Sequence, residues 1–150
     1  MNRNKHHLFL AAVAALLVVA TPAAFAAVWD GGGDGISWND AVNWDASGVP
    51  DTTSETAVFG NTDVGAVDFN IAGTTTIASL AANSFTGTYN LDLNGNTLQT
   101  VVDTSTTERL SIGNSTVAGT FNISNGTYTP QGGTWRIGLA GSGTVAVTTP

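Results

Sequence analysis

The sequence predicts an all-β protein whose strands form a right-handed parallel β-helix. Three observations support this fold class. Apolar and polar residues alternate with a period of two over short segments, Gly and Asn separate these segments, and one pair of segments recurs near the carboxyl end. An antiparallel β-sandwich is the alternative fold, because two similar hairpins would satisfy the same alternation.

The first segment, residues 1–26, has the features of a secretory signal peptide. Basic residues precede an uninterrupted apolar run over 8–20, and Thr21-Pro22 then interrupts a helix. The sequence Ala24-Phe25-Ala26 places small residues at positions −3 and −1 of a cleavage site before Ala27. An uncleaved anchor is the alternative, since about 20 apolar residues span a bilayer. We predict a secreted or outer-surface protein with no membrane span after cleavage.

Removal of this segment changes the chemistry that the chain can perform. The whole chain has 4 Lys+Arg, 11 Asp+Glu and 2 His, with no Cys. Arg3, Lys5, His6 and His7 leave with the signal, so 2 arginines remain against 11 acids and the net charge is −9. This composition excludes His-dependent nucleophilic sites and ordinary zinc sites, and it disfavours nucleic acid as a partner. We expect no catalytic residue and no cofactor.

Residues 27–59 are predicted to form a Trp/Gly-rich cap over one end of the β core. The segment contains Trp29, Trp38 and Trp44, three of the chain's 4 tryptophans, among several glycines. Buried indoles would hold such a loop-rich cap together. Exposed indoles would instead contact carbohydrate by stacking on sugar rings. The exposure of the three side chains therefore distinguishes the two interpretations.

The same segment contains a candidate calcium site. Asp30, Asp34 and Asp40 offer the oxygen ligands that calcium prefers. The spacing lacks the acidic alternation and the closing glutamate of a recognised calcium loop. Since Asp before Gly is also an ordinary turn sequence, we favour turns over a metal site.

Residues 60–150 are predicted to form the solenoid repeats. Two segments alternate strictly, and their expected inward positions are Val67, Phe69 and Ile71, then Tyr89, Leu91 and Leu93. Ile77 and Leu80 are expected to begin an intervening strand. A corner at Asn94-Gly95-Asn96 should precede a further strand over 98–102.

The clearest evidence for a solenoid is an internal repeat. Residues 110–113 and 119–123 are echoed by 135–138 and 143–147. The spacing from Ile112 to Ile137 is one residue longer than the spacing from Ile123 to Val147. Apolar positions coincide throughout, with Leu110 matching Trp135 and Phe121 matching Val145. The spacing between the two copies, from Ile112 to Ile137, fits the length of one coil of a β-helix. In such a fold, neighbouring coils bury each other's apolar residues.

These segments resemble a known family. The stretch from Trp29 to Phe59, then TTTIASLAANSFTGTYNLDLNGNTL, RLSIGNSTVAGTFNISNGTY and WRIGLAGSGTVAV, resembles bacterial autotransporter-associated β-strand repeat proteins. Similar chains occur among exported proteins with PEP-CTERM sorting signals. The resemblance implies a surface-displayed β-solenoid without a catalytic residue to carry over. The chain stops within a repeat at Thr148-Thr149-Pro150, so we expect a truncated or unusually short member.

We therefore expect a structural or adhesion protein of the cell surface or extracellular matrix, without catalytic activity. Its expected partners are extracellular polysaccharide or cell-surface components. A carbohydrate-binding module is the alternative. A β-helix polysaccharide lyase or hydrolase is less favoured, and its candidate residues are Asp92, Asp103, Glu108, Arg109 and Arg136.

Overall fold

The computed structural model describes most of the chain beyond the predicted signal peptide. The described ranges are 25–45, 48–60, 65–82, 85–101, 108–112, 119–137 and 143–148, with the backbone alone at 108–109, 134–137 and 143–148. The predicted signal peptide lies outside these residues, apart from Phe25 and Ala26.

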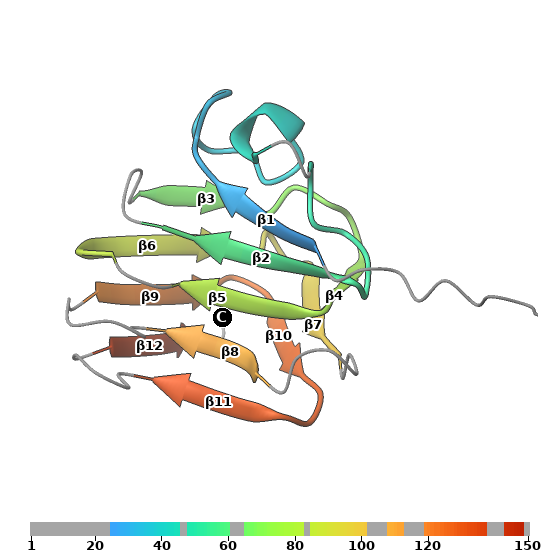
Figure 1. The fold of residues 1–150 in the computed structure, drawn as a ribbon, viewed down its shortest axis with the longest axis vertical. Helices are drawn as coiled ribbons and strands as arrows, with labels where there is room; N and C mark the ends of the chain where they lie inside the picture. Colours follow the sequence, from blue (N-terminus) through green and yellow to red (C-terminus); the bar gives the residue numbers. More distant parts are fainter. Residues whose placement is uncertain are drawn as a thin grey trace, which may run out of the picture.

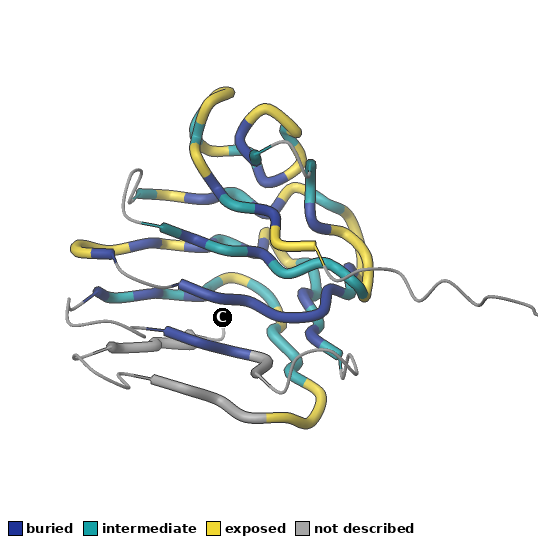
Figure 2. The backbone as a smooth tube through the Cα atoms, in the orientation of Figure 1, coloured by how far each residue is buried: buried dark blue, intermediate teal, exposed yellow. Residues whose placement is uncertain are grey.

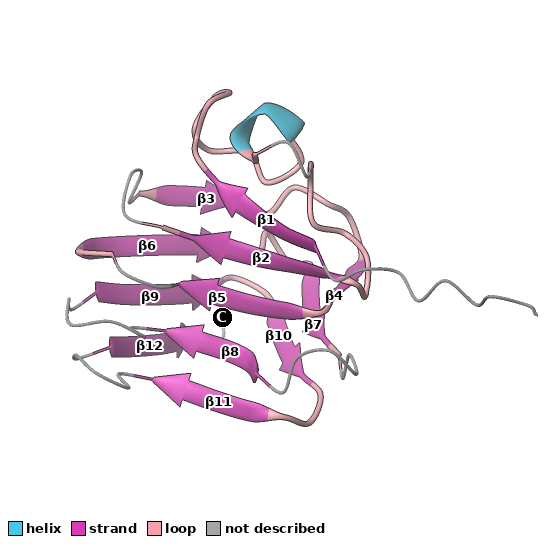
Figure 3. Ribbon diagram, in the orientation of Figure 1, coloured by secondary structure: helices cyan, strands magenta, loops and turns pink. Residues whose placement is uncertain are grey.

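The described residues form twelve β-strands and one short 3-10 helix (Figure 1), which confirms the all-β class. The strands are β1 (Phe25–Trp29), β2 (Glu55–Phe59), β3 (Ala66–Asp68), β4 (Thr74–Ile77), β5 (Ser79–Ala82), β6 (Gly87–Asp92), β7 (Thr97–Thr100), β8 (Glu108–Ile112), β9 (Gly119–Ser124), β10 (Thr127–Pro130), β11 (Thr134–Ile137) and β12 (Gly143–Thr148). The helix η1 (Ala41–Asn43) is the single helical element drawn in Figure 3.

The strands belong to three sheets, in which every ladder between named strands of the described chain is parallel. The strand orders are β1-β2-β5-β8-β11, β12-β9-β6-β3 and β10-β7-β4. From β2 onward, successive strands enter the three sheets in turn, so each strand from β2 to β9 pairs with the strand three places later. The antiparallel sandwich is therefore wrong, because its hairpins would pair neighbouring strands in opposite directions.

The pairings predicted from the internal repeat are confirmed. Leu110 lies opposite Trp135 and Ile112 opposite Ile137 in the β8–β11 ladder. In the β9–β12 ladder, Phe121 pairs with Val145 and Ile123 with Val147. The apolar matches in the sequence are therefore matches between adjacent strands.

Ile77 and Leu80 were predicted to begin one intervening strand, but they lie on either side of a corner between two strands. Ile77 ends β4 and Leu80 belongs to β5, and these strands lie in different sheets. Ala78 lies at the corner, where its N–H donates to the Glu55 carbonyl at 2.7 Å. Every residue from 77 to 82 is buried. Figure 2 shows β5, the strand after the corner, in dark blue. Because buried and exposed positions do not alternate here, the alternation of apolar and polar residues does not reveal the corner. The strand predicted over 98–102 is β7, and Val102 lies outside the described residues.

The core lies between the sheets and is filled by the inward residues of each strand. The predicted inward positions are fully buried at Val67, Phe69, Tyr89, Leu91 and Leu93, while Ile71 is partly buried. This confirms the period of two over both segments. Burial of each large apolar side chain contributes about 1.5–3 kcal/mol to folding.

Strands of different sheets meet through aromatic rings inside the core. The ring of Tyr89 in β6 lies 5.1 Å from that of Phe59 in β2, which belongs to a different sheet, measured between centroids. Within its own sheet, the Tyr89 ring lies 5.8 Å from that of its partner Phe121 in β9. The Tyr89 hydroxyl donates to the Gly60 carbonyl at 2.7 Å, which satisfies the polar end of a buried side chain. At Gly119, an added Cβ would collide with the Phe85 ring, so the close approach of strand and ring requires glycine.

The predicted corner at Asn94-Gly95-Asn96 is present. Asn94 has φ 50° and Gly95 has φ 76°, a left-handed conformation that Asn and Gly tolerate best. The Gly95 N–H donates to the Asn125 carbonyl of the following corner at 2.5 Å. Asn125 has φ 55°, so each of the two hydrogen-bonded corners contains one asparagine in the left-handed conformation.

Candidate functional site

The tryptophan loop (residues 30–45) covers the end of the sheets beside β1, at the top of Figure 1. Trp38 is 0% exposed, and the neighbouring Trp29 and Trp44 are 1% and 3% exposed. The ring centroids of Trp38 and Trp44 lie 4.8 Å apart, and those of Trp29 and Trp44 lie 5.1 Å apart. A sugar ring stacks only on an exposed indole face. These tryptophans therefore form a packed cluster and offer no surface for carbohydrate stacking.

Asp34 organises one turn of this loop. One carboxylate oxygen accepts hydrogen bonds from the backbone N–H groups of Ile36 and Ser37 at 2.8 and 2.7 Å. The other oxygen accepts from the Ser37 hydroxyl at 2.5 Å. The Asn43 amide donates to Asp34 as well, at 2.7 Å. These donors, the Ser37 hydroxyl foremost, hold the pKa of Asp34 well below its usual range, because they stabilise the charged form.

The other two calcium candidates also accept backbone N–H groups. Asp40 precedes η1 and accepts from Val42 N–H at 3.0 Å, while Asp30 accepts from Gly32 N–H at 2.9 Å. Within the described ranges, no group of three or more acidic side chains is arranged to hold a metal ion. The carboxylates at Asp30, Asp34 and Asp40 thus stabilise turns, as Asp commonly does in such loops.

Asn43 holds the loop together, a role that its sequence context does not reveal. Its side chain is fully buried. Its Oδ1 accepts from the N–H groups of Gly33 and Gly35 at 3.0 and 2.8 Å. Its Nδ2 donates to Asp34 and to the Ser37 carbonyl, the latter at 2.9 Å. Nothing in the sequence distinguishes Asn43 from other asparagines of the chain, because the partners are assigned by the fold.

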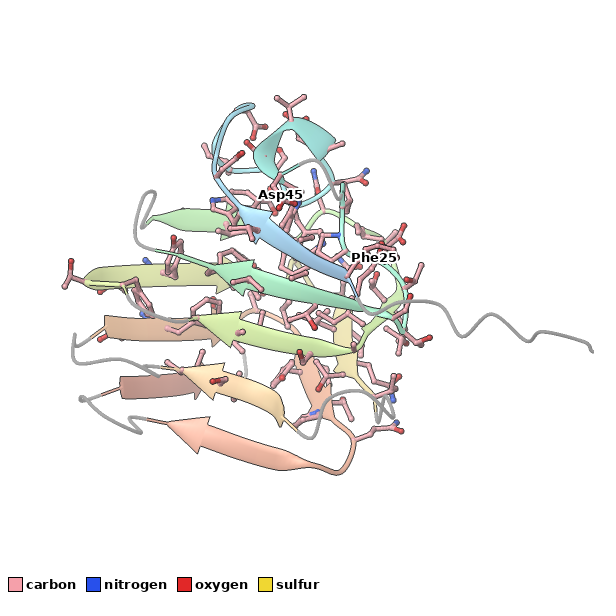
Figure 4. All side chains as sticks on the ribbon, viewed as in Figure 1. Phe25 and Asp45 are labelled. Atoms are coloured by element: carbon pink, nitrogen blue, oxygen red, sulfur yellow. The ribbon has the colours of Figure 1, made fainter. Side chains whose placement is uncertain are left out.

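The loop joins the first strand through a few backbone contacts. Figure 4 labels Asp45, near the end of the loop, and Phe25, at the start of β1. The Asp45 N–H of the loop donates to the Val28 carbonyl of β1 at 2.8 Å. At its other end β1 is held from outside the loop, where the Phe25 N–H donates to the Ser54 carbonyl at 3.0 Å. The Phe25 side chain is 55% exposed, whereas Ala27 is 1% exposed. The buried part of β1 therefore begins at Ala27.

A second feature with binding chemistry is the outer side of β6 and β9, which we call the polar face. Its members are Thr88, Asn90, Asp92, Thr120, Asn122 and Ser124. The parallel register places these residues opposite one another in three pairs, with Asn90 opposite Asn122 in the middle pair. All six side chains are exposed or half-buried, while the residues between them on both strands point into the core.

The two central amides of the polar face are joined by a hydrogen bond. Asn122 Nδ2 donates to Asn90 Oδ1 at 2.7 Å. The other two amide atoms of the pair, Asn90 Nδ2 and Asn122 Oδ1, have no hydrogen-bond partner among the described residues. At one end of the face, the backbone N–H of Asn94 donates to Asp92 at 2.9 Å, and the Asn94 amide donates to Asp68. The face therefore presents a fixed amide pair beside two carboxylates.

The third sheet also has a polar outer side. Its outward residues are Thr74, Thr76, Thr97, Gln99, Thr127 and Thr129. The Thr76 hydroxyl donates to Gln99 Oε1 at 3.4 Å. This surface carries hydroxyls with one amide and no charge, so it provides a comparison for the polar face.

The residues considered for polysaccharide cleavage are not brought together as a described site. Asp103 lies outside the described residues, and the structure describes the backbone alone at Glu108, Arg109 and Arg136. The β8–β11 register places Arg136 opposite Ser111, as the repeat predicts. Asp92 belongs to the polar face, where Asp68 lies opposite it in β3.

No family model, curated protein or solved structure matches the chain. Among the residues that the structure describes, no helix is both long and apolar enough to cross a membrane.

Proposed function

We propose that this protein is an exported, non-catalytic module that serves a structural or adhesive role at the cell surface or in the extracellular matrix. In this proposal its strands form a right-handed parallel β-helix, and the tryptophan loop closes one end. The proposed type of protein is the autotransporter-associated or PEP-CTERM-type solenoid that the sequence resembles.

The observation that carries this proposal is the order of strand pairing. Strands β2, β3 and β4 enter three different sheets, and β5, β6 and β7 then lie beside them in the same order. Such an order supports a coil of three strands that repeats along one axis. Equivalent outward residues of successive coils then form continuous surfaces, which suit contact with other extended molecules.

Export is supported by the position of the burial boundary. Phe25 and Ala26 are exposed, and Ala27 is the first buried residue of β1. Cleavage before Ala27 would therefore leave every buried side chain of this strand in the mature protein. The strand would keep its pairs from Ala27–Ala57 to Trp29–Phe59.

Export is tested by expressing the full chain in a bacterial host and sequencing the amino terminus of the secreted or surface-bound product. We expect the mature chain to begin at Ala27. Ala26→Leu should block cleavage, since the −1 position requires a small residue, while Val28→Ala should not. An unprocessed wild-type chain that stays in the cytoplasm would contradict export.

The absence of catalysis is tested with the purified mature protein. We expect no release of reducing or unsaturated sugar ends from a panel of bacterial, plant and algal polysaccharides. A structural or adhesive role predicts that cells lacking the protein attach to surfaces or form matrix less well, and that the added protein restores this. Cleavage of any polysaccharide, lost on Arg109→Ala or Arg136→Ala, would assign an enzyme instead.

A further inference from the structure

We propose that the polar face of β6 and β9 binds a neutral, hydroxyl-rich polysaccharide whose chain lies across the two strands. This inference rests on the proposed surface function and names the chemical class of its partner. It also moves the carbohydrate site away from the three tryptophans, which are buried.

The first reason is the regular arrangement of the side chains. Thr88, Asn90 and Asp92 lie opposite Thr120, Asn122 and Ser124. Adjacent strands are about 4.8 Å apart and successive outward residues of one strand are about 6.7 Å apart, so the six side chains form a small grid. A polymer of identical units suits such a grid, because each unit meets similar groups.

The second reason is the kind of hydrogen bond that the grid can form. The bond between Asn122 and Asn90 fixes the two amides relative to each other. It leaves the Asn90 NH₂ as a donor and the Asn122 carbonyl as an acceptor. The hydroxyls of the two threonines and the serine each donate and accept. Sugar hydroxyls also donate and accept, so they complement every group of the face.

The third reason is charge. After signal removal the chain has 2 arginines and 11 acids. Asp92 and the neighbouring Asp68 lie at one edge of the polar face. A polysaccharide with carboxylates or phosphates would be repelled there. The chemistry of the face therefore favours a neutral polymer.

The face offers no exposed aromatic ring, because Tyr89 and Phe121 point into the core. We therefore expect weak binding by one domain. Several copies displayed on one surface would bind the same polymer about 100-fold more tightly or better, through high effective concentration. Such behaviour suits a surface protein that holds matrix polymers through many contacts.

The test measures retardation of the purified mature protein in native gels. The gels contain dextran, mannan, soluble β-glucan, xylan or hydroxyethyl cellulose as neutral polymers, and alginate as the acidic one. We expect retardation by at least one neutral polymer and none by alginate. Asn90→Ala and Asn122→Ala should each weaken binding about fivefold or more. Alanine suits both positions, because Ala66 and Ala146 lie at the same register in the flanking strands.

Gln99→Ala is the matched control, since it removes an amide from the outer side of a different sheet. It should leave binding unchanged. Thr88→Val with Thr120→Val removes two hydroxyls at nearly constant shape and should also weaken binding. Circular dichroism and urea unfolding establish that each variant is folded.

The polar face is ruled out as a glycan site if no neutral polymer retards the protein. It is equally ruled out if alginate is bound more tightly, or if the folded Asn90, Asn122 and threonine variants bind like wild type. None of these results would alter the cleavage before Ala27 or the surface location. Failure of the glycan site can therefore be distinguished from failure of the proposed function.

Discussion

The tryptophan loop and the stacked strands are stabilised in different ways. In the loop, single side chains bind particular groups, and the side chain of Asn43 alone makes four hydrogen bonds there, three of them to the backbone. In the stacked strands, the same kinds of contact recur from one strand to the next, through parallel ladders and inward apolar residues. The comparison indicates that the loop depends on individual residues, whereas the stack depends on a repeated pattern.

The two regions meet at Phe59, at the end of β2. Its ring centroid lies 5.7 Å from that of Trp44 on the loop side and 5.3 Å from that of Phe121 on the strand side. Substitution of Phe59 should therefore destabilise both the tryptophan loop and the stacked strands.

The largest expected effect follows from Phe59→Ala. Removal of a buried ring leaves a cavity, and such changes lower the free energy of unfolding by about 4 kcal/mol. The change should also alter tryptophan fluorescence, because the ring packs against Trp29, Trp38 and Trp44. Urea unfolding followed by fluorescence measures both. Val58→Ala, at the adjacent outward position, is the control, and an equal loss there would contradict the role of Phe59.

Asn43→Ala tests the loop alone. It would leave the N–H groups of Gly33 and Gly35 and the Ser37 carbonyl without their side-chain partner. We expect a loss of about 2 kcal/mol, the size typical of unsatisfied polar groups. Asn39→Ala, at an exposed position of the same loop, should change the free energy of unfolding by less than about 0.5 kcal/mol. Equal effects of the two substitutions would show that the loop does not depend on Asn43.

Gly119→Ala tests close packing in the strand stack. The added Cβ would collide with the Phe85 ring, and overpacking lowers stability by about 1–3 kcal/mol. Gly60→Ala is the control, because a Cβ there meets nothing within 4 Å. Phe85→Leu should make Gly119→Ala less harmful, which a double-mutant cycle by urea unfolding would reveal. Additive effects would contradict the contact.

The strand region should lose stability in alkali through Tyr128 of β10. Burial raises the pKa of Tyr128 from 10.0 to about 12, although the bond to the Thr100 hydroxyl opposes the shift. The folded protein therefore keeps this proton where the unfolded chain has lost it, and the free energy of unfolding falls as the pH rises from 10 to 12. Urea midpoints across this interval should fall less for Tyr128→Phe. An identical slope in the variant would remove Tyr128 as the cause.

The tryptophan loop should respond to acid, with a smaller effect. Because the folded pKa of Asp34 is lowered, its charged form stabilises the loop above the ordinary aspartate pKa of 3.8. This contribution is lost as the pH falls through the folded pKa. Tryptophan fluorescence of the wild type should therefore change at low pH more than that of Asp34→Asn. A change of the same size in both proteins would show that Asp34 does not govern the transition.

The strand region could be predicted from the sequence better than the loop. Alternation located the inward positions from Val67 to Leu93, and the repeat correctly placed Ile137 opposite Ile112. The earlier repeats are harder to recognise because their length varies. The interval from Thr56 to its partner Ser79 is shorter than the interval from Leu80 to its partner Leu110. Additional residues between β7 and β8 lengthen the second interval, so the sequence shows no constant repeat period.

The candidate sites were predicted less well, for a physical reason. Composition identified the tryptophans and aspartates, but whether an indole is exposed depends on what the fold places over it. The polar face arises from pairing between Asn90 and Asn122, which are far apart in the sequence. Neither residue stands out in its own segment. A site whose residues come from strands far apart in the sequence can be recognised only when the pairing of those strands is known.

The parallel register of β6 and β9 is the basis of both the fold and the polar face, and one engineered pair tests it directly. The chain has no cysteine, so Asn90→Cys with Asn122→Cys introduces a single possible intramolecular disulfide. Paired residues of adjacent strands lie about 4.8 Å apart, within the Cα range of disulfides. As a control, Asn90→Cys with Gln99→Cys joins residues closer in sequence but in different sheets. We predict near-complete oxidation of the first pair, measured by mass spectrometry, and little of the second. Oxidation of the control pair in place of the first would contradict the stacked parallel arrangement.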